Sequence, residues 1–73
     1  MKINSLKELG TLIRQRRKSE HLTIETLSAL VPCSPRLLGE MERGIRNVSF
    51  EHVLCVCTLL GIDIIAKEKE ESR

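Results

Sequence analysis

Within six consecutive residues the chain carries a guanidinium, a carboxylate, apolar side chains and a glycine, groups that can read DNA base edges in the major groove. Arg36 is the strongest candidate, because a guanidinium can bond bidentately to O6 and N7 of guanine. Glu40 could accept from the amino group of cytosine, although a solvated helix carboxylate is the favoured interpretation. Pro35 and Leu37 could contact a thymine methyl group, and Gly39 would allow the backbone to approach the duplex closely.

A second group of residues carries donors that could bind DNA phosphates, which position a protein on the duplex without reading its sequence. These candidates are Thr23, Ser34, Arg43, Arg46 and Asn47. A basic cluster could also bind phosphate or could form a solvated helix face, and both interpretations have equal weight. The cluster consists of Arg14, Arg16, Arg17 and Lys18. The formal net charge is only +2, so charge excess alone cannot drive binding to a polyanion.

These side chains require two short helices that meet at an abrupt corner, and the sequence predicts them. Thr23 can cap a helix over residues 24–31, and Ser34 followed by proline is a typical start for a helix over residues 35–43. Gly44 can end the second helix in a left-handed cap. A link of about three residues suits a helix-turn-helix, whose second helix usually enters the major groove of DNA.

The remaining elements predict a small all-α domain of four to five helices around an aliphatic core. Ser5 begins a capping box for a helix over residues 6–18, and Ser49 can cap a helix over residues 50–60 that ends at Gly61. The predicted inward residues of these two helices are Leu6, Leu9, Leu12, Ile13, Val53, Leu54, Val56, Cys57 and Leu60. At the corner, the predicted core residues are Leu27, Val31, Cys33, Leu38 and Met41.

Glu42 and Arg43 are adjacent, so they cannot face each other on a helix. We expect Glu42 to point inward as the structural partner of Arg14 or Arg17, and Arg43 to be exposed.

The β-branched residues 62–66 predict a short edge strand, which needs a backbone partner. The simplest partner is the same strand of a second copy, related by a two-fold axis. This predicts a homodimer held by Ile62, Ile64 and Ile65; the alternative is a frayed extension of the fourth helix. Residues 1–66 would then form the domain, and residues 67–73 a charged flexible tail.

Other residues indicate neither catalysis nor metal binding. Cys55 and Cys57 lie about 200° apart around a helix, so they cannot share a metal or a disulfide. His21 and His52 belong to different elements, without cysteine or carboxylate partners at zinc spacing. We therefore expect no enzyme activity, metal or cofactor. No apolar run approaches the ~18 residues of a membrane span and no signal peptide occurs, which favours a cytoplasmic protein.

The chain resembles the Cro/phage-repressor (XRE-like) helix-turn-helix family, with a lambda-repressor-like fold, and within it the HipB-type antitoxins, over residues 6–66. The residues that carry this resemblance are Leu22-Thr23, Leu27, Ser28, Ser34, Leu38, Glu42-Arg43-Gly44 and Leu60-Gly61. The resemblance implies a homodimeric repressor that binds a palindromic double-stranded operator and represses its own promoter. It also implies a HipA-like serine/threonine kinase toxin as a partner.

Two positions depart from the family pattern. Ile24 stands where members usually carry glutamine at the start of the second helix, so a phosphate clamp is absent. Pro32 stands where many members carry glycine, and proline biases Val31 away from helical angles, so this helix is expected to end a residue early. These departures keep open an alternative function, a protein-interaction module with weak or no DNA binding.

Overall fold

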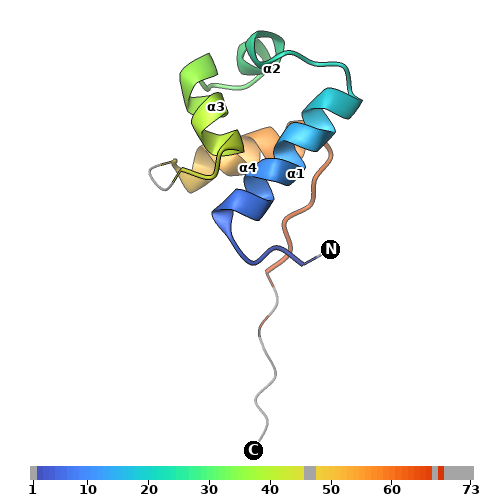
Figure 1. Cartoon of the computed structure of the whole chain (residues 1–73), viewed down its shortest axis with the longest axis vertical. Coiled ribbons are helices and arrows are strands. Elements are labelled where there is room, and N and C mark those ends of the chain that lie inside the picture. The colour runs from blue at the N-terminus through green and yellow to red at the C-terminus, as the bar shows by residue number, and fades with distance from the viewer. Residues whose placement is uncertain (1, 46–47, 67, 69–73) are drawn as a thin grey trace, which may run out of the picture.

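The computed structural model describes residues 2–45, 48–66 and 68 of the chain. This part of the chain contains four helices and no fifth: α1 (Leu6–Ser19), α2 (Ile24–Leu30), α3 (Pro35–Glu42) and α4 (Phe50–Leu59) (Figure 1). The predicted all-α architecture is confirmed. All four helices begin at the predicted residue and end within one residue of the predicted end.

Each helix begins directly after a serine or threonine whose hydroxyl oxygen accepts a backbone N–H of the first turn, at 3.0–3.2 Å. The capping residues are Ser5, Thr23, Ser34 and Ser49. These caps satisfy N–H groups that have no carbonyl partner within the helix. Half of the predicted capping box of α1 is confirmed, because Ser5 Oγ accepts from the N–H of Glu8 at 3.1 Å; the other half is displaced by one residue, because Glu8 Oε1 accepts from the N–H of Asn4 at 2.8 Å.

Three helices end in the same left-handed turn, in which two successive N–H groups donate back to the last helical turn at 2.8–3.2 Å. The residues with positive φ in these turns are His21 (58°), Gly44 (74°) and Gly61 (74°). Glycine adopts this conformation without steric cost, whereas histidine is strained in it. The predicted helix-ending roles of the two glycines are confirmed.

α2 does not end in a left-handed turn. It ends at Leu30, one residue before the end of the expected helix over residues 24–31, as Pro32 predicts. Val31 is extended, with φ −128° and ψ 154°. The N–H of Cys33 donates to Val31 O at 2.7 Å, which closes a three-residue turn centred on Pro32. Such a turn has a central φ of about −75°, close to the value that the proline ring imposes. Proline therefore forms this corner without the positive φ that a glycine would supply.

The core is aliphatic and draws on all four helices. Its buried residues are Ile13, Leu27, Val31, Leu38, Met41, Val53, Val56, Cys57 and Leu60. Leu6 and Leu54, which were predicted to face inward, are exposed. Leu6 lies at the first residue of α1, and Leu54 is rotated by about 100° from the buried Val53 on the same helix. Leu9 and Cys33 are half-buried and pack against the core, and Leu12 is also half-buried.

α1 and α3 approach each other so closely that one contact requires glycine. A Cβ atom at Gly10 would lie 2.5 Å from Met41 O and 2.6 Å from Glu42 O. Gly44 makes a similar contact, because a Cβ there would lie 2.5 Å from Lys7 Cα. The two glycines therefore set the distance between α1 and the end of α3.

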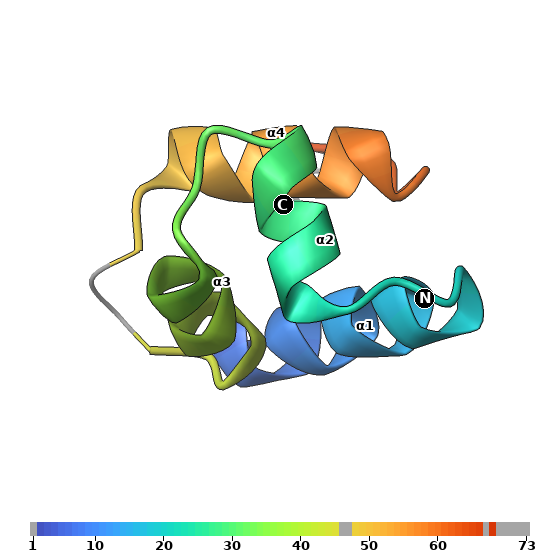
Figure 2. The same cartoon turned by 90° about the horizontal axis from the view of Figure 1, so that it is seen from above.

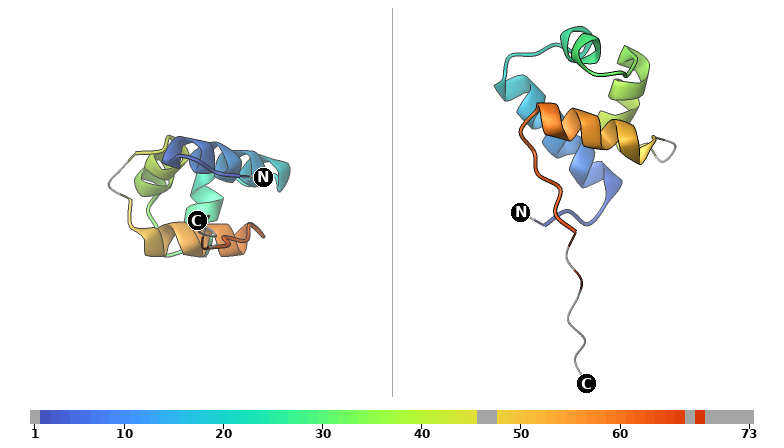
Figure 3. Two further views of the ribbon diagram at one scale, coloured as in Figure 1. Left: turned by 90° about the horizontal axis from the view of Figure 1, so that it is seen from below. Right: turned by 180° about the vertical axis from the view of Figure 1, so that it is seen from behind.

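α1 and α4 lie on opposite sides of the molecule, and α2 and α3 bridge them at one end (Figures 1 and 2). The described C-terminal segment leaves α4 and runs toward the other end, where the N-terminus also lies (Figures 1 and 3). α2 and α3 thus form a face that is remote from the first described residues and from residues 62–66.

Residues 62–66 form neither a helix nor a strand in the described part of the chain. The N–H of Ile62 donates to Cys57 O, so this residue completes the cap of α4 and excludes a helical extension. Ile64 is 40% exposed and Ile65 is 82% exposed. The strand and the dimer stay predictions. Of the predicted tail, only the exposed Glu68 belongs to the described residues.

Candidate nucleic-acid interface

The residues predicted to contact bases lie outside the buried side of α3, and they differ in exposure. Leu38, Met41 and Glu42 occupy the buried side of this helix. Pro35 and Arg36 are exposed, and Leu37, Gly39 and Glu40 are half-buried. The side chain of Arg36 is 89% exposed, so its guanidinium is free to reach a ligand.

Glu40 lies beside Arg36, one helical turn further along α3. Arg36 Nε is 3.5 Å from Glu40 Oε2, and the Glu40 side chain is 26% exposed. The sequence predicted a separate role for each of these two side chains. Their i, i+4 spacing was the signal that could have revealed the pair.

The predicted phosphate-binding residues are divided among the ends of the helices. Thr23 and Ser34 cap α2 and α3, and each hydroxyl oxygen accepts a backbone N–H. The hydroxyl of Ser34 can still donate to an anion, whereas that of Thr23 donates to Thr26 Oγ1 at 2.9 Å. Arg43 is exposed at the end of α3. The remaining two candidates, Arg46 and Asn47, lie outside the described residues.

A buried ion pair holds the end of α3 against α1. Arg17 donates to Glu42 through Nε to Oε2 at 2.6 Å and through NH2 to Oε1 at 3.1 Å, and NH1 donates to Leu22 O at 2.7 Å. Arg17 is 7% and Glu42 is 9% exposed. The hydrogen bond to Glu42 raises the pKa of Arg17 above its usual value, so the pair stays ionised. The prediction of Glu42 as the inward partner of a first-helix arginine is confirmed, and the partner is Arg17.

The basic cluster on α1 is divided between structural and exposed residues. Arg16 Nε donates to Leu60 O at 3.1 Å, and its NH2 group is 3.5 Å from Glu20 Oε2. Together with Arg17, half of the cluster therefore makes contacts inside the molecule. Arg14 and Lys18 are exposed and could contact an anion. No local sequence signal relates Arg16 to the carbonyl of Leu60, because the two residues are far apart in the chain.

Ile24 is half-buried and packs against the core. The first residue of α2 therefore offers no polar group to a phosphate. It contributes to the packing of the corner instead.

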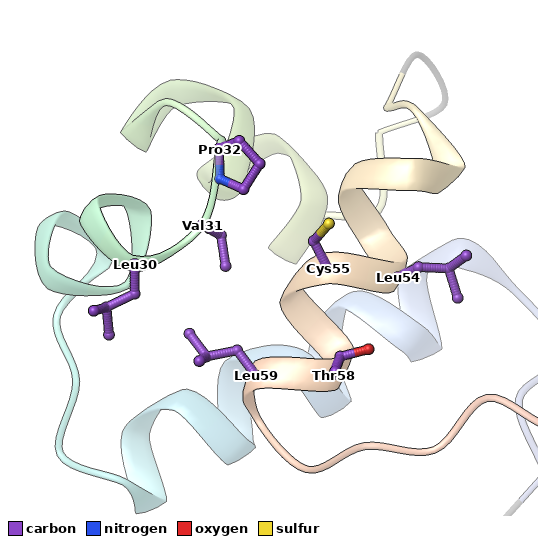
Figure 4. A pocket seen from close by; sticks show the side chains of 7 residues that line it. All are labelled: Leu30, Val31, Pro32, Leu54, Cys55, Thr58 and Leu59. Carbon is purple, nitrogen blue, oxygen red and sulfur yellow. The ribbon is translucent and has the colours of Figure 1, made fainter.

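An apolar groove of about 380 Å³ lies between the end of α2 and α4 (Figure 4). It is lined by Leu30, Val31, Pro32, Leu54, Cys55, Thr58 and Leu59. None of these side chains is charged, and none belongs to the predicted DNA-contacting set. The groove is therefore distinct from the exposed side of α3.

The cysteines are dispersed over the corner and α4. Burial raises the pKa of the Cys33 and Cys57 thiols, which disfavours the reactive thiolate. Cys55 is exposed in the groove. Among the described residues, no three His, Cys, Asp or Glu side chains are placed to hold a metal ion.

A family model described as a helix-turn-helix domain matches residues 8–68. No curated protein matches the chain. None of the described helices is both long enough and apolar enough to cross a membrane. The matched region includes all of α2, α3 and α4 and most of α1.

Proposed function

Since the chain belongs to the helix-turn-helix domain family, we propose that it is a sequence-specific double-stranded DNA-binding transcriptional regulator. Helix-turn-helix domains place their second helix in the major groove of DNA. In this chain that helix is α3, and Arg36 is the residue that we assign to base reading. Pro35 and Leu37 would make apolar contacts beside it.

The placement of charge along α3 carries this proposal. α1, α2 and α4 each have a glutamate in the first turn, whereas α3 has none there and carries Arg36. The N-terminal end of a helix has a partial positive charge, so an acid stabilises it and a base destabilises it. Arg36 therefore does not serve the stability of α3. A first turn with an exposed guanidinium and no carboxylate of its own suits contact with the electronegative edge of DNA.

We also propose a homodimer, in which residues 62–66 of two copies pair as antiparallel strands. Ile64 and Ile65 are exposed, and the segment lies away from α2 and α3, so pairing there would leave both α3 helices accessible. A two-fold dimer would bind a palindromic operator whose half-sites are about one helical turn apart.

The antitoxin role rests on the resemblance to HipB-type proteins. In this proposal the dimer is cytoplasmic, represses its own promoter and binds a HipA-like kinase toxin. Operator binding is then by the dimer alone or by the complex of the dimer with the toxin. A gene for a kinase-like protein directly adjacent to this one would support the role, and a solitary gene would argue against it.

One observation favours the alternative function of a protein-interaction module. Ile24 packs against the core. In the Cro/phage-repressor family, which the chain resembles, this position usually carries a phosphate-binding glutamine. Together with a net charge of only +2, this lowers the expected affinity for any DNA.

Gel retardation distinguishes the two functions. We expect the purified chain to retard a fragment of its own promoter at low ionic strength, and the complex to survive an excess of unrelated duplex. If the chain retards no native promoter fragment even at low ionic strength, the DNA-binding proposal is wrong and the interaction module is favoured.

A further inference from the structure

We propose that Glu40 is a positioning residue that orients the guanidinium of Arg36 toward guanine and does not itself contact a base. The inference rests on the proposed DNA-binding function and specifies how α3 would discriminate between sequences. It predicts a guanine at one fixed position of each half-site.

The geometry of the pair supports this role. Long side chains on a helix point toward its N-terminal end, so the carboxylate of Glu40 reaches back over one turn to Arg36. Oε2 is 3.5 Å from Nε, the guanidinium nitrogen nearest to the backbone. When Nε–H and the parallel N–H of NH2 face a carboxylate, the terminal edge of the guanidinium, formed by the other N–H of NH2 and one N–H of NH1, points in a different direction. These are the two donors that fit O6 and N7 of guanine.

The two side chains of the pair differ in exposure. The Glu40 side chain is 26% exposed, whereas that of Arg36 is 89% exposed. The Glu40 carboxylate is therefore the more buried member of the pair, and the Arg36 guanidinium extends from it into solvent. The pair restricts the orientations of the Arg36 side chain before DNA binds. Less conformational entropy is therefore lost on binding than for an unpaired exposed arginine.

Helix stability does not explain the pair. The order with arginine before glutamate is the less favourable one for an i, i+4 pair, because each charge then lies at the unfavourable end of the helix dipole. An exposed pair of this kind also contributes little to folding. Near DNA, a carboxylate repels phosphates, so Glu40 should reduce affinity for all sequences. A gain in specificity would offset that cost.

Arg43 provides a matched control on the same helix. It is exposed like Arg36, and its NH1 group lies 3.8 Å from the Cβ position of Gly39, so its guanidinium folds back along α3. Among the described ion pairs, Glu40 is paired with Arg36 and not with Arg43. Replacing Arg43 therefore removes a similar charge without disturbing the proposed pair.

The test measures base preference by selection from randomised duplexes, followed by fluorescence anisotropy on the selected site and its single-base variants. The full-length chain is compared with Arg36→Ala, Glu40→Gln, Glu40→Asp, the double variant Arg36→Ala/Glu40→Gln, and Arg43→Ala. Far-UV circular dichroism verifies that each variant is folded.

We expect wild type to prefer guanine at one position by about five-fold or more, and Arg36→Ala to lose this preference. Glu40→Gln should bind unrelated DNA more tightly but discriminate less at the same position. Glu40→Asp keeps the charge but withdraws the carboxylate from Arg36, so this variant should discriminate less against other bases without binding unrelated DNA more tightly.

In the Arg36→Ala background, Glu40→Gln should have no further effect on base preference. Arg43→Ala should weaken all binding and leave the preference intact.

Two results would overturn the inference. If Glu40→Gln leaves guanine discrimination unchanged, Glu40 is only a solvated carboxylate. If it alters the preference at another position, and does so without Arg36, Glu40 reads a base directly. A wild-type chain with no base preference anywhere would instead refute the proposed function.

Discussion

The guanidinium of Arg17 holds together α1, the α1–α2 connection and the end of α3. All of its bonds are to groups of the molecule itself, so it is not available to DNA. Its role is to hold the end of α3 against α1. A basic residue inside a cluster that resembles a phosphate site is therefore structural.

Removing one partner of the buried Arg17–Glu42 pair should lower the stability of the fold. We expect Glu42→Ala to lower the free energy of unfolding by about 3–5 kcal/mol, because it leaves a buried charge without a partner. Urea denaturation followed by circular dichroism measures the change. The double variant Arg17→Met/Glu42→Leu removes both charges and should recover most of the loss. A loss of under about 1 kcal/mol for Glu42→Ala would show that the pair is solvated.

His21 presents the opposite case, a residue whose replacement should stabilise the molecule. It has a φ of 58°, a conformation that costs a residue with a side chain about 1–3 kcal/mol. We expect His21→Gly to raise the free energy of unfolding by about 0.5–1 kcal/mol, after the greater flexibility of glycine in the unfolded chain is subtracted. Thermal denaturation measures the gain. Gly61→Ala, at a φ of 74°, is the converse control and should destabilise.

Arg36 and Arg43 should differ in how they contribute to DNA binding. Arg36→Ala is expected to weaken operator binding and relax base preference, since it removes a base contact. Arg43→Ala should weaken binding to all sequences and reduce the slope of log affinity against log salt by about one. Arg46, outside the described residues, is predicted to behave like Arg43. An identical, sequence-independent loss for Arg36 and Arg43 would contradict the assignment of base reading to Arg36.

At the scale of elements, the contact between α1 and α3 decides how the recognition helix is presented. Backbone atoms of α3 lie directly against Gly10, with no room for a methyl group. The buried Arg17–Glu42 pair lies further along the same contact. The position of α3 thus depends on the close contacts at Gly10 and Gly44 and on one ion pair.

The two helical glycines should therefore respond in opposite directions to the same substitution. Gly10→Ala should lower the free energy of unfolding by up to about 2 kcal/mol, because an overpacking cost of about 1–3 kcal/mol outweighs a helix-propensity gain of about 1 kcal/mol. Gly39→Ala should raise it by up to about 1 kcal/mol, because its added Cβ would meet only Arg43 NH1, at 3.8 Å. Denaturation of both variants under the same conditions measures the difference. Stabilisation by Gly10→Ala would show that the helices can separate without cost.

At the scale of the whole molecule, the face formed by α2 and α3 and the C-terminal segment lie at opposite ends (Figure 1). This separation would allow the proposed dimerisation and the proposed DNA binding to occur independently within one small chain. With nine buried core side chains in its described part, the protomer also has a small core that a second copy would support.

The proposed terminal pairing can be tested without DNA. We expect Ile64→Pro to lower the mass in sedimentation equilibrium from that of a dimer toward that of a monomer, because proline removes a donor from the strand ladder. Ile64→Thr keeps the N–H and the β-branched shape and serves as the matched control. An unchanged mass for Ile64→Pro would leave dimerisation to another surface.

The features that the sequence predicted correctly depend mostly on interactions between residues close in the chain. The four hydroxyl caps, the glycine turns and the early end of α2 before Pro32 each depend on hydrogen bonds or steric contacts between residues close in sequence. The inward direction of Glu42 followed from its position on the helix. The period of the apolar residues also predicted most of the core.

Only the tertiary structure selected among the contacts between distant segments. It paired Glu42 with Arg17 and not Arg14, directed Arg16 to the carbonyl of Leu60, and placed Gly10 against the backbone of α3. These outcomes depend on the distance and rotation of two packed helices, which neither helix contains in its own sequence. Local hydrogen bonding therefore determined where the helices begin and end, and packing between them decided which charges are buried and which remain free for a ligand.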